Sequence, residues 1–274
     1  MLTNVDEIAA LIARRLQRDP ETLASQWRSS TPVRHFVVDD LLPSAEVEEL
    51  AAAMPNPSTL LLKDSLRERK RVGVRVGNYH PAVGAHLFAF QNKGIADIVA
   101  SITGLTGSQP DPTLYASGIS VMSKDDFLNP HLDNSHDGDQ KLYRVLNLLF
   151  YLAPRWASEN GGNLELWDER LQTPVTIDAR FNRLVVMETN QRSWHSVSRV
   201  RIAATRLCLS NYYFSKESPT GEQYRNVTSF RGRPEDSLLR RLRLRTDAAF
   251  LNAVGRLMPS LLTRNRHRLG KVEK

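Results

Sequence analysis

Two histidines and one aspartate stand out because their residue types and spacing suit a metal ion. His131 and Asp133 are separated by one residue in "HLDNSHD", and His195 follows much later, in "SWHSVS". A strand points residues i and i+2 to the same face, so the imidazole and the carboxylate of the first pair would face one object. An isolated triplet of this kind more often forms a surface turn. With a second histidine, however, it matches the facial triad of non-haem Fe(II) sites, which leaves positions open for a co-substrate and oxygen.

An arginine inside an apolar segment strengthens the metal hypothesis. Arg206 lies in "TRLCLSNYYF", 11 residues after His195. Burying a guanidinium is costly unless a carboxylate meets it, and a two-pronged clamp on an organic acid would provide that partner. Strand alternation groups the polar positions of this segment, and those of "RVLNLLFYL", as the lining of a ligand pocket: Ser210, Tyr212, Asn147 and Tyr151.

The elements that must position these residues change in character near Gly107. Before it, apolar residues recur at helical spacing over 4–17, 21–27 and 44–54 and in two stretches within 81–105, with a strand around Val37. After it, short β-rich runs alternate with Gly, Pro, Asn and Asp turns, which predicts an antiparallel sandwich or barrel. Seven strands are predicted: 114–122, 143–152, 163–168, 173–178, 183–188, 194–200 and 205–214.

The amino-acid composition indicates the kind of protein and the cellular compartment to expect. Apolar residues make up 41% of the 274 residues and charged residues 24%, which is ordinary for a globular protein. Cys208 is the only cysteine, which excludes an internal disulfide and fits a reducing compartment. No stretch approaches the roughly 20 apolar residues that span a bilayer, and the N-terminus lacks the features of a signal peptide. We therefore expect a cytoplasmic protein without a transmembrane segment.

The net charge of +7 is concentrated at the C-terminal end. Residues 231–274 contain 12 Lys+Arg and 4 Asp+Glu, so the rest of the chain is close to neutral. Two helices with basic faces are predicted there, over 234–245 and 246–258. Such helices could bind an anionic membrane surface, nucleic acid or an acidic protein. It is equally consistent with the sequence that they bind no partner and simply expose their basic faces to solvent. We expect iron binding to survive deletion of 231–274.

The order and spacing of these motifs resemble the Fe(II)/2-oxoglutarate-dependent dioxygenases of the prolyl 4-hydroxylase-like group. The resemblance runs from about residue 113 to 215, and weaker similarity begins at about 34. The family pattern is His-x-Asp, an "R-V-x-x-x-x-x-Y-L" strand, "G-G-x-L", a distal histidine and then a basic residue. Here these are His131 and Asp133, "RVLNLLFYL" at 144–152, "GGNLELW" at 161–167, His195 and Arg206.

The resemblance implies an α+β protein with a mainly β core, a double-stranded β-helix or cupin-type jelly roll with flanking helices. It divides the chain into a helical supporting region (1–103), the dioxygenase core (104–216) and a basic helical tail (217–274). It implies that Fe(II) and 2-oxoglutarate bind and that O2 is consumed, with L-ascorbate as an optional reductant. The implied roles are iron ligands at His131, Asp133 and His195, a 2-oxoglutarate clamp at Arg206 and Tyr151, and pocket lining at Asn147, Leu164 and Ser210.

The reaction implied is hydroxylation of an unactivated C–H bond, on a prolyl or other peptide residue. A sugar, a lipid-linked glycan and a small metabolite stay open as substrates. Retention of Asp133 favours hydroxylation over halide transfer. A catalytically silent jelly-roll binding module is a rival that the complete ligand set argues against, and the neutral body disfavours a nucleic-acid enzyme. The nearby His136 is expected to be a solvent-facing loop residue.

Overall fold

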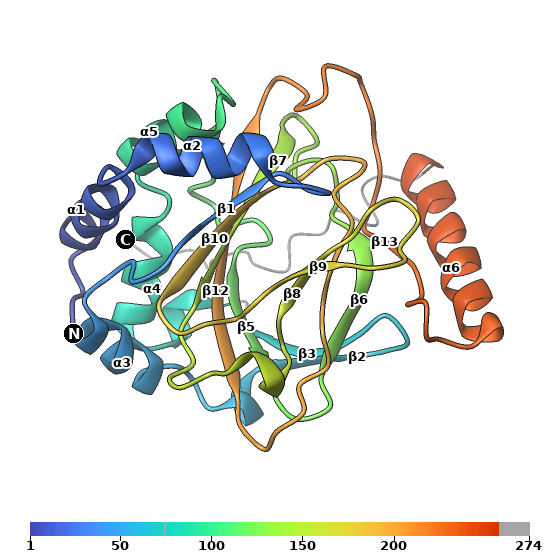
Figure 1. Cartoon of the computed structure of the whole chain (residues 1–274), viewed down its shortest axis with the longest axis horizontal. Coiled ribbons are helices and arrows are strands. Elements are labelled where there is room, and N and C mark those ends of the chain that lie inside the picture. The colour runs from blue at the N-terminus through green and yellow to red at the C-terminus, as the bar shows by residue number, and fades with distance from the viewer. Residues whose placement is uncertain (74, 258–274) are drawn as a thin grey trace.

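A curled antiparallel sheet forms the body of the protein (Figure 1). The computed structural model describes residues 1–73 and 75–257. Within this part, 13 strands make one sheet whose main path runs β1-β10-β7-β12-β5-β3-β6-β11-β8-β9. Three further strands join it at the side, because β2 pairs with β3, β4 with β12, and β13 with β6. Every pairing between these strands is antiparallel.

The bounds of the strands are β1 His35–Val38, β2 Leu61–Asp64, β3 Glu68–Gly73, β4 Gln109–Pro110, β5 Gly118–Met122, β6 Phe127–Leu132, β7 Tyr143–Tyr151, β8 Leu164–Leu166, β9 Val175–Ile177, β10 Arg183–Glu188, β11 His195–Val197, β12 Arg206–Ser215 and β13 Ser229–Phe230. The bounds of the helices are α1 Val5–Leu16, α2 Pro20–Ser29, α3 Ser44–Ala52, α4 Pro81–Ala89, α5 Lys93–Thr103 and α6 Leu238–Leu257, with 3-10 turns η1 Pro57–Thr59, η2 Val76–Asn78 and η3 Ser158–Asn160.

The sheet folds over into two facing walls because β3 pairs with strands of both. β3 bonds to β5 on one side and to β6 on the other. One wall is therefore β1-β10-β7-β12-β5, and the other is β6-β11-β8-β9. Folding the sheet in this way leaves an interior between the walls, with β1 and β9 as the ends of the path. The arrangement is the predicted jelly roll.

Five helices cover the outer face of the first wall, and α6 lies on the opposite side of the molecule beside β13 (Figure 1). The apolar stripe predicted for the first helix is buried, with Ile8, Ile12 and Leu16 fully covered. Asn4 caps this helix, because its side-chain oxygen accepts hydrogen bonds from the first-turn amides. Because the helices cover only the outer face of this wall, its other face is free to line the interior.

Strand β7 shows how the sequence separates the two faces. Leu148 and Phe150 belong to the apolar cluster under the helices, whereas Tyr151 belongs to the cluster between the walls. This alternation is the period-2 pattern of a strand with different surroundings on each face. The inner cluster, built mainly of apolar side chains from both walls, surrounds the polar residues considered below.

All seven strands predicted after Gly107 are present, as is the strand predicted around Val37, but five strands were not predicted. The basic run at 63–75 contains most of the β2–β3 hairpin, and β4, β6 and β13 are short strands without an alternating apolar signal. The two helices predicted in the tail are one helix, α6, because no Pro or Gly interrupts the chain between them. Met258, the end of the second predicted helix, lies outside the described residues.

Candidate metal centre and co-substrate pocket

The register between β6 and β11 brings the two histidines together. His131 is the penultimate residue of β6, and His195 is the first residue of β11. These strands are neighbours, and His195 is the direct cross-strand partner of His131. Their ring centroids lie 4.1 Å apart. Asp133 follows directly after β6, so the predicted spacing places its carboxylate on the same side as His131.

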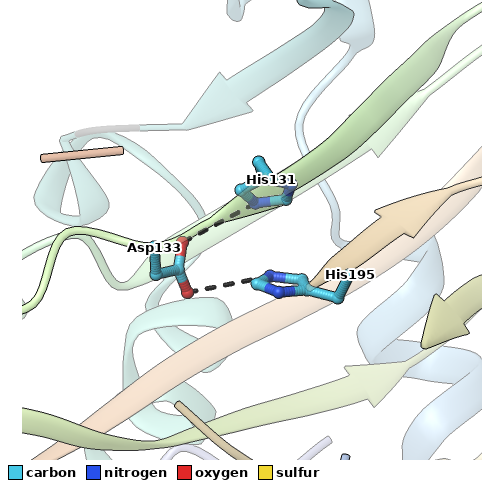
Figure 2. Close-up of side chains that lie close together, drawn as sticks. All are labelled: His131, Asp133 and His195. Carbon is cyan, nitrogen blue, oxygen red and sulfur yellow. Dashed lines mark ion pairs between the residues drawn. The ribbon is translucent and has the colours of Figure 1, made fainter. Parts of the chain in front are cut away.

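The three side chains converge on one point (Figure 2). Nε2 of His131 lies 3.7 Å from Oδ1 of Asp133, and Nε2 of His195 lies 3.8 Å from Oδ2. One ligand atom from each residue lies within 4.8 Å of the other two. These distances are too long for hydrogen bonds but suit three ligands arranged around a common ion.

Backbone carbonyls fix which nitrogen of each histidine faces this point. Nδ1 of His131 lies 3.0 Å from the carbonyl oxygen of Asn129, and Nδ1 of His195 lies 2.9 Å from that of Ser193. A carbonyl oxygen can only accept a hydrogen bond, so each Nδ1 carries the proton. Each Nε2 is then left with a free lone pair, which is the arrangement found in metal-binding histidines.

The protonation states also suit a cation. Burial, and then the neighbouring His195, lower the pKa of His131 to about 3, so its ring is neutral near pH 7. Burial by itself would raise the pKa of Asp133, but Arg144 and the two histidines hold it below its usual value. Oδ2 of Asp133 is buried and has no hydrogen-bond partner. Because such an orphaned atom is costly, a metal ion bound by these three residues fits the site.

Arg206 lies deeper in the interior, on β12, and carries a charge without an acidic partner. It is 2% exposed, and its guanidinium stacks on the ring of Tyr151 from β7 at 4.8 Å. Nε of Arg206 and the hydroxyl of Tyr151 are both buried without a hydrogen-bond partner. Among the residues that the structure describes, no acidic side chain forms an ion pair with Arg206. A carboxylate of 2-oxoglutarate fits this pair of groups.

The other predicted pocket residues surround this region at different depths. Asn147, from β7, has a buried side-chain oxygen without a partner, and its amide lies 3.5 Å from the hydroxyl of Tyr212. Leu164, from β8, is buried in the same inner apolar cluster as Tyr151. Ser210 is half-buried and lines an open cavity. Their roles in binding remain predictions.

A cavity of about 420 Å³ connects the centre with the surface. His131, Asp133 and Ser210 lie on its inner side. Its outer wall includes the β2–β3 hairpin, where Lys70 and Lys63 lie 3.0 and 3.7 Å from the carboxylate of Glu68. The unpredicted hairpin therefore forms part of the approach to the candidate metal centre.

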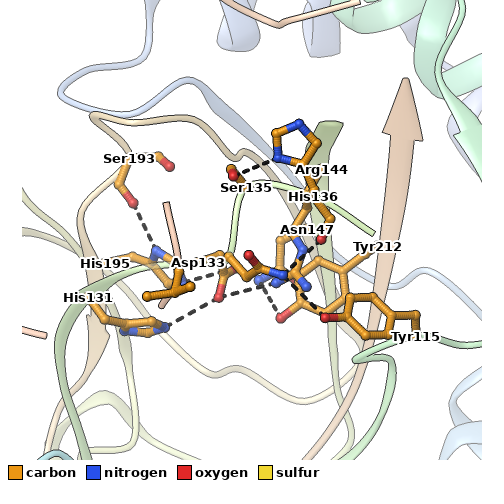
Figure 3. Close-up of polar contacts among 12 residues, drawn as sticks. Tyr115, His131, Asp133, Ser135, His136, Arg144, Asn147, Ser193, His195 and Tyr212 are labelled. Carbon is orange, nitrogen blue, oxygen red and sulfur yellow. Dashed lines mark hydrogen bonds and ion pairs between the residues drawn. The ribbon is translucent and has the colours of Figure 1, made fainter. Parts of the chain in front are cut away.

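Arg144 is a site residue whose role the sequence did not reveal. It is 4% exposed, lies 3.5 Å from Oδ1 of Asp133 and stacks on Tyr212 at 4.2 Å (Figure 3). It therefore holds the aspartate in its ionised form and restrains its orientation. Its place as the first residue of "RVLNLLFYL", a charge opening an apolar strand, is the signal that could have marked it.

Part of the predicted tail also belongs to the site. The ring of Phe230, in β13, stacks on His131 with centroids 5.1 Å apart and planes inclined by 17°. The side-chain amide of Asn226 donates to the carbonyl of Asp133 at 2.8 Å. We call residues 224–233 the C-terminal strap, because they lie across the loop and the strand that carry two of the three candidate ligands.

The structure corrects the expectation for His136. It is 9% exposed rather than solvent-facing, because its ring packs on Tyr143 at 4.4 Å and its Nδ1 lies 2.7 Å from the hydroxyl of Ser135. It is not among the residues that converge with Asp133. No helix of the described chain is long and apolar enough to cross a membrane.

Comparisons with known proteins agree with this geometry. Residues 117–214 match the family model described as the 2OG-Fe(II) oxygenase superfamily. Prolyl 3-hydroxylase OGFOD1 of Mus musculus is 30% identical over 135 residues, which cover 47% of this chain and 24% of that protein. The chain thus spans about a quarter of the length of this relative.

Solved structures show the same fold at low sequence identity. A prolyl-4-hydroxylase from Pseudomonas putida superposes with a TM-score of 0.54 and 18% identity, covering 72% of this chain and all (100%) of that one. A prolyl hydroxylase from Trichoplax adhaerens, in complex with a hypoxia inducible factor peptide, gives 0.53 and 17%, covering 74% and 93%.

These structures confirm the predicted double-stranded β-helix with flanking helices. The family match includes all three converging residues and Arg206. The segment 117–214, which holds His131, Asp133 and His195, therefore matches the 2OG-Fe(II) oxygenase superfamily, and the similar proteins named above are prolyl hydroxylases.

Proposed function

We propose that the protein is an Fe(II)- and 2-oxoglutarate-dependent hydroxylase that acts on a prolyl or other residue of a peptide. The observation that carries the proposal is the convergence of His131, Asp133 and His195, with ligand atoms in the right protonation states, on one buried point. A silent binding module has no need of three such groups.

The residues of the chain have separate tasks in this reaction. Nε2 of each histidine and the carboxylate of Asp133 hold the iron. Arg206 and Tyr151 bind the far carboxylate of 2-oxoglutarate and so orient the co-substrate toward the metal. Iron and co-substrate, once bound, supply oxidative hydroxylation of a C–H bond, coupled to decarboxylation of 2-oxoglutarate to succinate. Four of these five side chains are buried, and Asp133 is 11% exposed where the open cavity reaches the centre.

A peptide is the substrate that the relatives favour. The mouse relative is a prolyl 3-hydroxylase, and the Trichoplax enzyme was solved with a peptide. A small molecule is the second candidate, because the carbocyclase SnoK from nogalamycin biosynthesis shares the fold with a TM-score of 0.52 at 14% identity. Since the fold occurs with both classes, it does not choose between them. The single cysteine supports a cytoplasmic location within the same proposal.

Turnover by purified protein tests the proposal. The protein is supplied with Fe(II), 2-oxoglutarate and oxygen, and incubated with proline-containing peptides or with a metabolite extract. Succinate is measured together with mass spectra of products that have gained one oxygen atom. We expect product from the peptide arm, and loss of both signals in Asp133→Ala. The matched control is His136→Ala, which removes a nearby histidine outside the triad.

Three outcomes have distinct meanings. Product only from the extract would move the substrate to the small-molecule class. Turnover that persists in Asp133→Ala would remove the proposed triad. Absence of succinate in every arm, although the wild-type protein binds Fe(II), would contradict the oxygenase activity itself.

A further inference from the structure

A second cavity, away from the candidate metal centre, is lined by four arginines. Arg170 comes from the loop between β8 and β9, Arg231 from the C-terminal strap, and Arg241 and Arg245 from successive turns of α6. The cavity holds about 30 Å³, and Leu171, Gly232 and Pro234 complete its lining. It shares no lining residue with the cavity at the metal centre.

The four positive charges have no acidic partner in the part of the chain that the structure describes. None of the four arginines forms an ion pair there. The nearby acids are engaged elsewhere: Glu169 lies 3.3 Å from Arg192, and Asp236 lies 3.2 Å from Arg240. Burial, and then the charge of Arg245, lower the pKa of Arg231. Glu169 acts on Arg231 in the opposite sense, but its carboxylate is already paired with Arg192, so the four like charges repel one another without an ion-pair partner of their own among the described residues.

The fold holds two of these arginines in place. The guanidinium of Arg231 stacks on the ring of Trp194 at 4.5 Å and donates to the carbonyl of Glu169 at 3.4 Å. Arg241 lies against Gly232, where an added Cβ would come within 2.8 Å of the arginine Cγ. Only glycine allows α6 to approach the strap this closely. Packing therefore presents Arg231 and Arg241 to the cavity, while Arg170 and Arg245 line it as exposed side chains.

We propose that this cavity binds a phosphate-class oxyanion, either free phosphate or the phosphomonoester head of an anionic lipid. The planar fork of a guanidinium matches two oxygens of such an anion, and several forks can share its remaining oxygens. A bound anion supplies the missing counter-charge. It also ties together three segments that are separate in sequence: the β8–β9 loop, the strap and α6. This site is independent of the proposed hydroxylation.

Binding of inorganic phosphate to the full-length protein tests the site. Affinity is measured calorimetrically at constant ionic strength, with chloride as the balancing anion. We expect wild-type protein to bind phosphate, and Arg241→Gln and Arg245→Gln to bind it at least about tenfold more weakly, because each loses charged hydrogen bonds. The matched control is Arg243→Gln, an exposed arginine of the same helix that does not line the cavity, and it should bind like wild type.

Vesicles distinguish the two sources of the anion. If phosphatidate vesicles sediment the wild type and Arg243→Gln but not Arg245→Gln, and free phosphate does not bind, the ligand is a lipid head group. Binding of free phosphate with the same dependence on arginines identifies a soluble anion. The proposal is overturned if neither probe binds, or if Arg243→Gln weakens binding as much as Arg241→Gln and Arg245→Gln do.

Discussion

Two buried arginines face the candidate site from neighbouring strands, and they differ in what they contact. Arg144 already has Asp133 as its carboxylate, with Tyr212 beneath it. Arg206 has the ring of Tyr151 beneath it, and its Nε has no hydrogen-bond partner. A guanidinium in a dry interior is stable only when its charge is met, so Arg206 is the one that needs a carboxylate from a ligand.

Substitutions of Arg206 and Tyr151 should therefore raise the KM for 2-oxoglutarate, and the size of the increase should depend on the substitution. Arg206→Ala leaves a carboxylate without its charged partner and should cost about 3–5 kcal/mol, or at least two decades in affinity. Arg206→Lys keeps the charge but loses the fork, so its effect should be smaller. Tyr151→Phe removes one hydrogen bond and should cost about 0.5–1.5 kcal/mol, or up to about 3 with a charged acceptor.

The measurement is succinate formation against 2-oxoglutarate concentration, with Fe(II) binding as a control for an intact site. An Arg206→Ala protein that folds, binds iron and keeps the wild-type KM would mean that another group binds the co-substrate.

The sequence revealed a candidate site residue where the chemistry of its side chain conflicts with that of its neighbours in the chain. Arg206 is a charge in an apolar strand, and His131 and Asp133 share a spacing that few structural roles require. Phe230 gave no such signal, because a phenylalanine suits any core, and its contact with His131 depends on pairing between strands far apart in the chain. No local pattern encodes that pairing.

Among the elements, the C-terminal strap contacts two of the three candidate ligands, His131 and Asp133. β13 extends the sheet beside β6 and sets Phe230 opposite His131. The side-chain amide of Asn226 donates to the carbonyl of Asp133. Its backbone N–H donates to the hydroxyl of Ser135, and its carbonyl accepts from the N–H of Ser135. The strap therefore restrains both ligands of the His-x-Asp pair from outside the family-matched segment.

Loosening the strap should weaken metal binding without removing a ligand. Partners that orient metal ligands typically contribute about 10–100-fold in affinity, and we expect a loss in this range for Asn226→Ala and Phe230→Ala. Phe230→Tyr keeps the ring and should restore most of the affinity. Titration with Co(II), followed by its visible absorption, measures the change without turnover. Wild-type Co(II) affinity in both alanine variants would show that the strap does not position the ligands.

The hairpin of β2 and β3 was missed for a physical reason. Its two strands, LLKD and ERKRVG, are mostly charged and show no alternation of polar and apolar residues. Such a strand faces a wet cavity on one side, so apolar periodicity, the main signal of a strand, is absent. The ion pairs of Glu68 with Lys63 and Lys70 support it instead.

At the scale of the whole molecule, part of the predicted basic tail packs against the β core. The backbone of Arg231 donates to Pro130 at 2.8 Å, and the guanidinium of Arg233 lies 2.7 Å from the carboxylate of Glu165. The serine next to His195, Ser196, also bonds to Glu165 at 2.6 Å. Residues after 230, which the charge pattern assigned to a separable appendage, thus contact both ligand-bearing strands.

Two truncations should distinguish the role of α6 from that of the C-terminal strap. Removing 238–274 deletes α6 and most of the basic charge, so salt-sensitive binding to anionic liposomes should fall while Co(II) binding persists. Removing 224–274 also deletes the strap, and Co(II) binding should fall with it. The two proteins are compared by vesicle sedimentation and Co(II) titration. Equal Co(II) affinity in both would show that the strap, like α6, is separable from the metal centre.

The direct pairing of His131 with His195 links metal loading to the accuracy of folding. Sliding β11 by a single residue along β6 would turn its imidazole to the other face of the sheet and destroy the site. The ion adds its binding free energy only to chains with the native alignment. A cell that loads iron during synthesis would thereby enrich correctly aligned chains. In a purified batch, the fraction that accepts Co(II) measures how many molecules have achieved that alignment.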